Sequence, residues 1–281
     1  MKLGIFAKTF DGTKPSIVLN SVAEAGFTSA QYNMACSGLP PMPETISEAQ
    51  ARSVTEAARS SGVEIVAVSG TYNMIHPDPS MREVGLRKLA TLAERCVGMS
   101  TGLITLCTGT RDSIDQWKAH ADNNTPAAWR DLLEAMEAAV TIAERYDVDL
   151  GIEPELANVV NSAEKAHRLI SALKSPRIKI VLDPANLFEV ATLDDQRRIV
   201  SSAIDLLADR IVMAHAKDRH PDGSFATAGK GVLDYAHYLR CLKAIGFSGS
   251  LVTHGLSASE AAGAATFLKS ALDCEGAGRG R

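Results

Sequence analysis

Four short apolar runs in the second half of the sequence end on, or carry near their ends, a side chain that can bind a metal ion or move a proton. These side chains are Glu153 in VDLGIEPE, Asp183 in IKIVLDP, His215 in RIVMAHAKD and His254 in GSLVTHG. Carboxylate and imidazole donors together suit Mn²⁺, Fe²⁺, Co²⁺, Ni²⁺ or Zn²⁺ better than Mg²⁺ or Ca²⁺, which prefer shells of oxygen alone. Each side chain taken alone is as often a helix cap or a satisfied buried group as a metal ligand. If the four runs are neighbouring strands, however, the side chains meet and form a site for one divalent metal ion.

Two more polar side chains lie next to these strand ends. Glu155 follows Glu153 by two residues, so both share one face of the strand, and either carboxylate could act as a general base. Lys217 ends the run RIVMAHAK on the inward face and is a candidate for binding a substrate oxygen or an anionic group. The alternative for Lys217 is a salt bridge with Asp183 or Asp218.

The loops that follow the third and fourth apolar runs contain other candidates for substrate contacts. Arg111 in TGTRD could clamp a carboxylate or a phosphate, or it could interact with the neighbouring Asp112 in solvent. His76 in YNMIHPD could contact the substrate, although a surface position is the default for a loop histidine. Tyr72 and Trp117 could present flat faces to a sugar, with packing in the core or a lid as the alternative.

The elements that would position these residues alternate along the whole chain of 281 residues. Short β-rich apolar runs alternate with longer stretches in which apolar residues recur at helical spacing. The predicted strands are at 2–8, 27–33, 63–70, 102–109, 148–155, 178–184, 210–218 and 249–255. The predicted helices are at 16–26, 47–62, 81–99, 127–146, 162–174, 194–209, 235–246 and 258–272. Eight such units predict an α/β fold, a (β/α)₈ TIM barrel that forms a single domain over 1–273. The glycine-rich end, 274–281, is expected to be a flexible tail.

The connections in this pattern differ in length according to direction. Turns from helix to strand are short and contain stop signals, as in SSGV at 60–63, whereas connections that leave the strands are long and polar. Long loops on one rim of a barrel are the usual place for a substrate site. The pattern therefore places the site at the C-terminal ends of the strands, where the four candidate ligands lie.

Composition narrows the classes of partner. A formal net charge of −4 gives no overall field that would attract nucleic acid or an anionic membrane surface. The first residues lack the small-residue cleavage site of a secretion signal, and no segment approaches the length of a membrane span. We therefore expect a cytoplasmic protein with a small-molecule partner. The five scattered cysteines form no CxxC pair, so neither a disulfide framework nor a thiolate zinc site is predicted. We expect buried or idle thiols, with a role in the site as the alternative for Cys107, which ends an apolar strand.

Several motifs, taken in order, resemble those of the xylose-isomerase-like TIM-barrel superfamily, which includes sugar isomerases and epimerases, inosose dehydratases and endonuclease IV. They are IEPE, LDPANLF, HAKDR, GKGVLDY and IGFSGSLVTHG. The resemblance covers essentially the whole chain. It implies that one divalent ion is bound by the residues matching Glu153, Asp183 and His215 and by a glutamate that ends the last strand. In this sequence His254 occupies the place of that glutamate.

Two departures from the family pattern affect the expected chemistry. An imidazole that binds a metal through one nitrogen retains only an N–H at the other, so a metal-bound His254 is a poor base and a two-base epimerisation is impaired. Asn186 stands in LDPAN where many relatives have a histidine, and we expect it to bind substrate. Without that histidine, and with an acidic net charge, the three-metal DNA repair chemistry of endonuclease IV is not expected.

The resemblance implies a divalent-metal-dependent isomerase or epimerase that acts on a small sugar or keto-polyol through a metal-stabilised ene-diolate. One alternative is a lyase or dehydratase of a keto-sugar or keto-inositol on the same metal site. Another is a sugar-binding barrel without catalysis, because a fold does not imply a function. The expected partner is a small carbohydrate, and the apolar helix AAGAATFLKSAL is compatible with a homodimer or a homotetramer.

Overall fold

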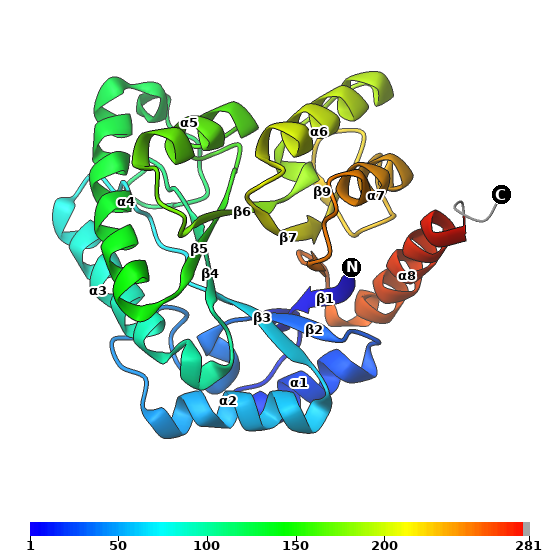
Figure 1. Cartoon of the computed structure of the whole chain (residues 1–281), viewed down its shortest axis with the longest axis horizontal. Coiled ribbons are helices and arrows are strands. Elements are labelled where there is room, and N and C mark those ends of the chain that lie inside the picture. Colours follow the sequence, from blue (N-terminus) through cyan, green and yellow to red (C-terminus); the bar gives the residue numbers. More distant parts are fainter. Residues whose placement is uncertain (278–281) are drawn as a thin grey trace.

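The structure, a computed structural model, describes residues 1–277 and consists of one closed parallel barrel surrounded by helices (Figure 1). The barrel strands pair in the order β1-β10-β7-β6-β5-β4-β3-β2, and the first and last of these also pair, which closes the sheet. The strands are β1 (Lys2–Phe6), β2 (Ser29–Tyr32), β3 (Glu64–Ser69), β4 (Leu103–Cys107), β5 (Asp149–Glu153), β6 (Ile178–Leu182), β7 (Ile211–Ala216) and β10 (Ser250–Thr253). The predicted (β/α)₈ TIM barrel is confirmed.

Eight α-helices of the described chain pack around the barrel. They are α1 (Pro15–Glu24), α2 (Glu48–Ser61), α3 (Pro79–Arg95), α4 (Pro126–Tyr146), α5 (Ala163–Leu173), α6 (Leu193–Leu207), α7 (Tyr235–Ala244) and α8 (Ala261–Ala277). Short 3-10 turns are η1 (Ala7–Thr9), η2 (Met34–Ser37), η3 (Val97–Met99), η4 (Ala121–Asn124), η5 (Pro184–Asn186) and η6 (Ala258–Glu260). Most α-helices begin at a Ser, Thr or Asp whose side chain accepts a hydrogen bond from a backbone N–H of the first turn, as Ser47 does for α2.

Two features differ from the sequence expectations. The long connection after β7 contains a small antiparallel pair, β8 (Asp218–Arg219) and β9 (Phe225–Ala226), that has two residues in each strand. The predicted tail begins at 274, whereas α8 continues to Ala277. The rest of that tail, 278–281, lies outside the described residues.

The buried apolar side chains form two layers. The larger layer lies between the strands and the helices and includes the outward-facing residues of the strands, such as Ile152 and Ala214. The smaller layer fills the barrel interior and consists of Ala67, Val181, Met213 and Val252. This interior layer lies below the C-terminal ends of the strands, so it forms a packed floor for whatever the strand ends hold.

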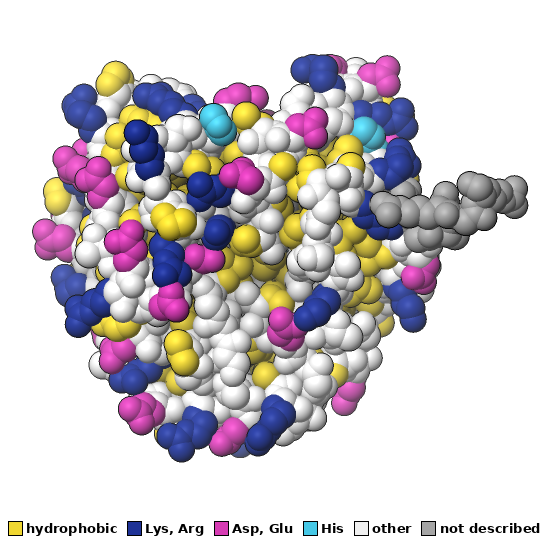
Figure 2. Space-filling model, in the orientation of Figure 1, with side chains coloured by type: hydrophobic (Ala, Val, Ile, Leu, Met, Phe, Trp, Pro, Cys, Tyr) yellow, Lys and Arg dark blue, Asp and Glu magenta, His cyan; other side chains and the backbone are white. Residues whose placement is uncertain are grey.

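The surface carries both signs of charge. Figure 2 shows Lys and Arg side chains interspersed with Asp and Glu over the face in view, and the face has no broad patch of one sign. None of the helices in residues 1–277 is both long enough and apolar enough to cross a membrane.

Candidate metal centre

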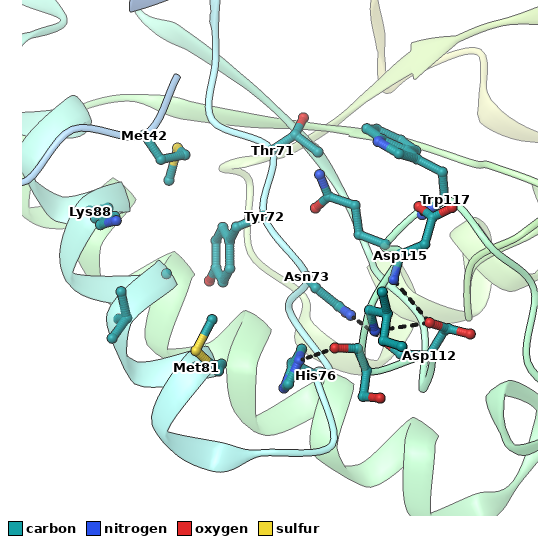
Figure 3. A pocket seen from close by; sticks show the side chains of 15 residues that line it. Met42, Thr71, Tyr72, Asn73, His76, Met81, Lys88, Asp112, Asp115 and Trp117 are labelled. Carbon is teal, nitrogen blue, oxygen red and sulfur yellow. Dashed lines mark hydrogen bonds between the residues drawn. The ribbon is translucent and has the colours of Figure 1, made fainter. Parts of the chain in front are cut away.

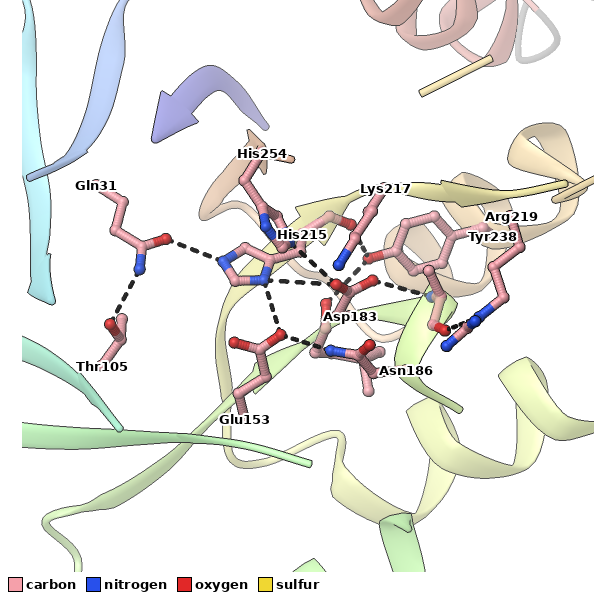
Figure 4. A network of polar contacts seen from close by, with 12 residues as sticks. Gln31, Thr105, Glu153, Asp183, Asn186, His215, Lys217, Arg219, Tyr238 and His254 are labelled. Atoms are coloured by element: carbon pink, nitrogen blue, oxygen red, sulfur yellow. Dashed lines mark hydrogen bonds and ion pairs between the residues drawn. The ribbon is translucent and has the colours of Figure 1, made fainter. Parts of the chain in front are cut away.

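Four side chains from four strand ends converge at the C-terminal mouth of the barrel. Glu153 ends β5, Asp183 follows β6, His215 lies in β7 and His254 follows β10. One ligand atom from each residue can be chosen so that the four atoms all lie within 4.8 Å of one another. Strands β5, β6, β7 and β10 are consecutive neighbours in the barrel, so residues far apart in sequence meet in one place (Figure 4).

The contacts within this cluster show how the donor atoms face one another. Nδ1 of His215 lies 3.2 Å from Oε1 of Glu153 and 3.9 Å from Oδ2 of Asp183. The same Oδ2 lies 3.0 Å from Nε2 of His254, and the two imidazole rings have centroids 4.3 Å apart. Two carboxylates and two imidazoles arranged in this way could hold one divalent ion, and the mixed oxygen and nitrogen donors fit a transition metal better than Mg²⁺.

Neighbouring polar groups orient two of the four candidate ligands. Nε2 of His215 donates to the amide oxygen of Gln31 over 3.0 Å, and the amide nitrogen of Gln31 donates to Oγ1 of Thr105 over 3.0 Å. These two hydrogen bonds direct Nδ1 of His215 toward the carboxylates. On the other side, Nδ2 of Asn186 donates to Oε1 of Glu153 over 2.9 Å. Such outer partners fix the direction of metal ligands and are part of the site.

The charges of the four residues are strongly interdependent. Burial alone would raise the pKa of Asp183, but the hydrogen bond and charge of His254 and the charge of His215 outweigh it and lower that pKa to about 2. Burial would likewise raise the pKa of Glu153, yet His215 lowers it. For His215 burial acts to lower the pKa, and the facing carboxylates raise it. Burial, followed by the charge of His215, lowers the pKa of His254. The carboxylates are therefore held ionised, as metal ligands must be.

Glu155 and Lys217 face the same mouth but lie outside the cluster. Burial and then the negative charge of Glu153 raise the pKa of Glu155 to about 7. Nζ of Lys217 lies 3.1 Å from the centre of the Phe225 ring in β9. Among the described residues, this contact takes the place of the salt bridge with Asp183 or Asp218 that the sequence allowed. The two side chains bring a carboxylate and an ammonium group to one opening, where they could handle a proton and a substrate oxygen.

Most of these groups line one cavity, which we call the metal chamber, whereas Asp183 and Asn186 are buried behind its wall. Its volume is about 460 Å³, within the range that holds a small ligand. Glu153, Glu155, His215, Lys217 and His254 contribute to its wall. The chamber therefore combines the candidate metal centre with room for a substrate directly above it.

Comparisons with known proteins agree with this architecture. The model of the family described as xylose isomerase-like TIM barrel matches residues 19–271. The chain belongs to that family. A search of curated proteins finds no significant match.

Solved structures of the same fold include enzymes with different reactions. L-ribulose 3-epimerase shares 16% identity at a TM-score of 0.77, with 98% of this chain and 95% of that chain covered. IolI with a bound zinc atom shares 17% identity at a TM-score of 0.73, with 100% of each chain covered. AsbF from Bacillus anthracis, named a probable 3-DHS dehydratase, shares 12% identity at a TM-score of 0.75, with 96% of this chain and 99% of that chain covered. At these identities the likeness concerns the fold.

Within this xylose isomerase-like barrel, three of the predicted substrate contacts are engaged by the protein itself. The guanidinium group of Arg111 donates to Asp131 over 2.6 Å and to the carbonyl of Ile75 over 3.1 Å, so its partner is a residue of α4 rather than the neighbouring Asp112. Asn186 is 1% exposed and lies behind Glu153, where it acts on the carboxylate.

His76 uses both ring nitrogens in loop contacts. Nε2 lies 3.2 Å from the carbonyl of Ser113, and Nδ1 accepts from the backbone N–H of Asp78 over 3.0 Å. Cys107 lines the metal chamber, but burial keeps the pKa of its thiol well above the usual value, so it presents a neutral S–H. Neither residue lies in the ligand cluster.

Sequence reasoning missed Gln31, Thr105 and Phe225. Gln31 and Thr105 occupy inward positions of β2 and β4, and a polar residue at an inward position of an otherwise apolar strand is a signal that could have found them. Phe225 follows PDGS in a long polar loop, where an isolated aromatic residue gives no periodic signal. Only the hairpin of β8 and β9 brings it over Lys217.

Proposed function

We propose that this protein is a divalent-metal-dependent isomerase or epimerase of a small sugar or keto-polyol. The convergence of Glu153, Asp183, His215 and His254 on one spot beneath a substrate-sized cavity is the observation that carries the proposal. A bound Mn²⁺, Co²⁺, Zn²⁺, Fe²⁺ or Ni²⁺ ion would polarise the carbonyl of a hydroxy-ketone and stabilise the negative charge of the ene-diolate. The zinc atom in the neighbour IolI and the activity named for L-ribulose 3-epimerase support this reading.

The roles of the protein's own residues follow from their positions. Glu155 is the proposed base, because it faces the chamber and lies outside the ligand cluster, so its oxygens remain free to take the proton next to the carbonyl and return it to the neighbouring carbon. Glu153 is the alternative base, although its Oε1 is engaged by His215 and Asn186. Lys217, whose Nζ lies over the Phe225 ring at the chamber wall, is proposed to hold a substrate oxygen.

A lyase or dehydratase reaction of a keto-sugar or keto-inositol is the second candidate. The observation that favours it is His254, which lies against Asp183 and, as a ligand, has no free acceptor with which to work from the opposite face of the substrate. One base on one face suffices for isomerisation or for loss of a β-hydroxyl group. The dehydratase named for the neighbour AsbF supports this candidate.

The proposal is tested by proton exchange. A panel of ketoses and keto-inositols is incubated in D₂O with the protein loaded with Mn²⁺ or Co²⁺, and deuterium at the carbon next to the carbonyl is followed by NMR. Uptake with conversion to an isomer supports the first candidate, whereas growth of an enone absorbance in the ultraviolet supports the second. Sugar binding without deuterium uptake across the panel would leave a binding barrel and sink both enzymatic candidates.

The role of His254 is tested separately by metal analysis. We expect the variant His254→Ala to retain less ion than wild type when both are loaded and desalted together. An unchanged ion content would assign His254 to the substrate instead. The matched control is His167→Ala, in α5 and away from the cluster, which should retain the wild-type ion content.

We also propose a cytoplasmic enzyme that acts as a homodimer or homotetramer. The five free cysteines are compatible with a reducing compartment, and no nucleic acid or membrane partner is proposed. Light scattering of the purified protein measures the assembly directly, and a monomer at all accessible concentrations would refute that part of the proposal.

A further inference from the structure

A second cavity adjoins the metal chamber, and we call it the distal cavity. Its volume is about 480 Å³, and it lies between α3 and the loops that follow β3 and β4. Thr71, Gln116 and Trp117 line both cavities. Figure 3 shows Thr71 and Trp117 at one end of the distal cavity and Met81 and His76 at the other. The two cavities therefore meet, and a ligand held over the metal centre could extend past Trp117 into the second space.

Hydrogen bonds between the two loops shape the distal cavity in advance of any ligand. Asn73 accepts from the backbone N–H of Thr110 over 3.0 Å and donates to the carbonyl of the same residue over 2.9 Å. The contact of His76 with the carbonyl of Ser113 joins the loops a second time. Asp115 accepts from the backbone N–H of Trp117 over 2.9 Å and fixes the start of the segment that carries the indole. Because these loops are already held in place, ligand binding should cost little conformational entropy of the protein.

Two aromatic side chains give the distal cavity flat apolar surfaces. The Tyr72 ring packs on the backbone of α3 at Gly85, where a Cβ would lie 2.0 Å from Cδ2 of the ring. A glycine inside a helix costs about 1 kcal/mol relative to alanine, and here it makes room for the ring. Trp117 is 51% exposed at the junction of the cavities. A half-exposed indole beside a preformed hollow is a suitable surface for stacking a sugar ring or an aromatic ring.

The charges in the distal cavity favour a neutral ligand. Lys88 pairs with Glu44 over 3.3 Å, and Asp112 pairs with Lys118 over 3.3 Å. The lining adds the carboxylate of Asp115, which would repel a phosphate. A sugar ring presents hydroxyl groups and ring C–H groups. The distal cavity offers polar groups that can pair with the hydroxyl groups and flat apolar faces that can pack against the C–H groups.

We propose that the distal cavity binds a second ring attached to the keto-sugar, so that the substrate is a glycosylated ketose rather than a free monosaccharide. This inference rests on the proposed function, because it takes the metal chamber as the place of the keto-sugar. Trp117 lines both cavities, so both sugar rings would lie beside it. Val84 on α3 lines the distal cavity but not the metal chamber.

Binding measurements test the inference. Fructose is compared by calorimetry with lactulose, maltulose, turanose and isomaltulose, each of which is fructose carrying a second sugar ring, on Mn²⁺-loaded protein. We expect at least one disaccharide to bind at least about tenfold more tightly than fructose. Trp117→Ala and Val84→Trp, which removes a stacking face and fills the distal cavity respectively, should each lower that ratio by at least about fivefold. The control is Val97→Ala, which is 77% exposed and outside both cavities, and it should keep the ratio.

An NMR titration of the metal-free protein removes the dependence on the metal. The chain contains two tryptophans, and Trp129 in α4 lies under the guanidinium group of Arg168, 4.1 Å from its ring centre, so its indole N–H signal is an internal reference. A disaccharide should shift the Trp117 signal, assigned by its loss in Trp117→Ala, and leave the other in place.

Each proposal can fail without the other. If no disaccharide binds more tightly than fructose, if the ratio survives both substitutions, or if all four disaccharides leave the Trp117 signal unmoved, the inference on the distal cavity is overturned. A disaccharide preference without deuterium uptake would refute the proposed enzyme and leave the binding site for a second ring standing.

Discussion

The two ends of the barrel interior use the same strands for opposite purposes. At the lower end the inward side chains pack against one another, and two residues further along the same face the strands carry the candidate metal ligands. The pairs, with the packing residue first, are Val181 and Asp183, Met213 and His215, and Val252 and His254. The change from packing to chemistry therefore takes one inward step, about 6.6 Å of strand.

This arrangement shows what the packed end contributes to the reactive end. A shift of one residue in any strand would turn its ligand to the outer face, because side chains alternate in direction along a strand. The register pairs Val252 with His215 and Ser250 with Met213 across β10 and β7. Close packing of the interior layer fixes that register, and so it fixes the height at which the ligand atoms meet. The comparison predicts that the two ends can be damaged separately.

The largest effect is expected for Asp183→Asn at the reactive end. Asp183 is buried and faces both imidazoles, so replacing its charge should reduce metal affinity by more than the roughly 10–100-fold typical of losing an outer partner. The change leaves the fold intact, because an asparagine can still accept the hydrogen bond from the backbone N–H of Ala185. Competition with a chelator measures the affinity, and circular dichroism controls for folding. Retention of wild-type metal affinity would contradict the proposed centre.

The next effect is expected for Glu155→Gln, which keeps the shape of the side chain and removes the proposed base. Loss of a general base lowers the rate of proton exchange by about 10²–10⁴-fold. Metal content should stay at the wild-type level, since Glu155 lies outside the ligand cluster. Deuterium uptake and metal analysis on the same sample separate the two. The matched control is Glu189→Gln, an exposed glutamate after η5, which should change neither quantity.

The packed end is tested by Met213→Ala. Met213 is 1% exposed in the interior layer, and truncating a buried methionine costs about 2–5 kcal/mol of unfolding free energy. Urea denaturation of the metal-free protein measures that loss. Metal affinity should be retained under native conditions, because His215 keeps its own contacts with Gln31 and Glu153. If the substitution abolished metal binding in a folded protein, the two ends would not be separable.

The sequence predicted the barrel well because its signals are local. Each strand is a short apolar run and each helix has an apolar stripe, and both repeat often enough to define the topology. The candidate ligands were predicted because strand ends at one rim must converge. The β8–β9 hairpin was missed because strands of two residues are shorter than any periodic pattern. The partner of Arg111 was missed because Asp131 lies on the face of α4, and only the packed fold brings the two together.

The contact of Gln31 with His215 illustrates the same limit. The two residues are separated by 184 positions and meet across the barrel. The sequence shows a polar residue in the second predicted strand, but its partner depends on the closure of the sheet and on the side-chain rotamers of both residues. The candidate ligands are thus easier to predict from the sequence than the residues that orient them.

The smallest effect is expected for Gln31→Ala, which leaves the four candidate ligands and the interior packing unchanged. The imidazole of His215 would lose the acceptor of its Nε2–H and could rotate, so metal affinity should fall by about 10–100-fold. Thr105→Val removes the partner of Gln31 and should cause a smaller loss in the same direction. Chelator competition on the three proteins gives the series. Equal affinity in Gln31→Ala and wild type would mean that packing alone orients His215. The packed end of the barrel interior would then extend one layer closer to the C-terminal ends of the strands.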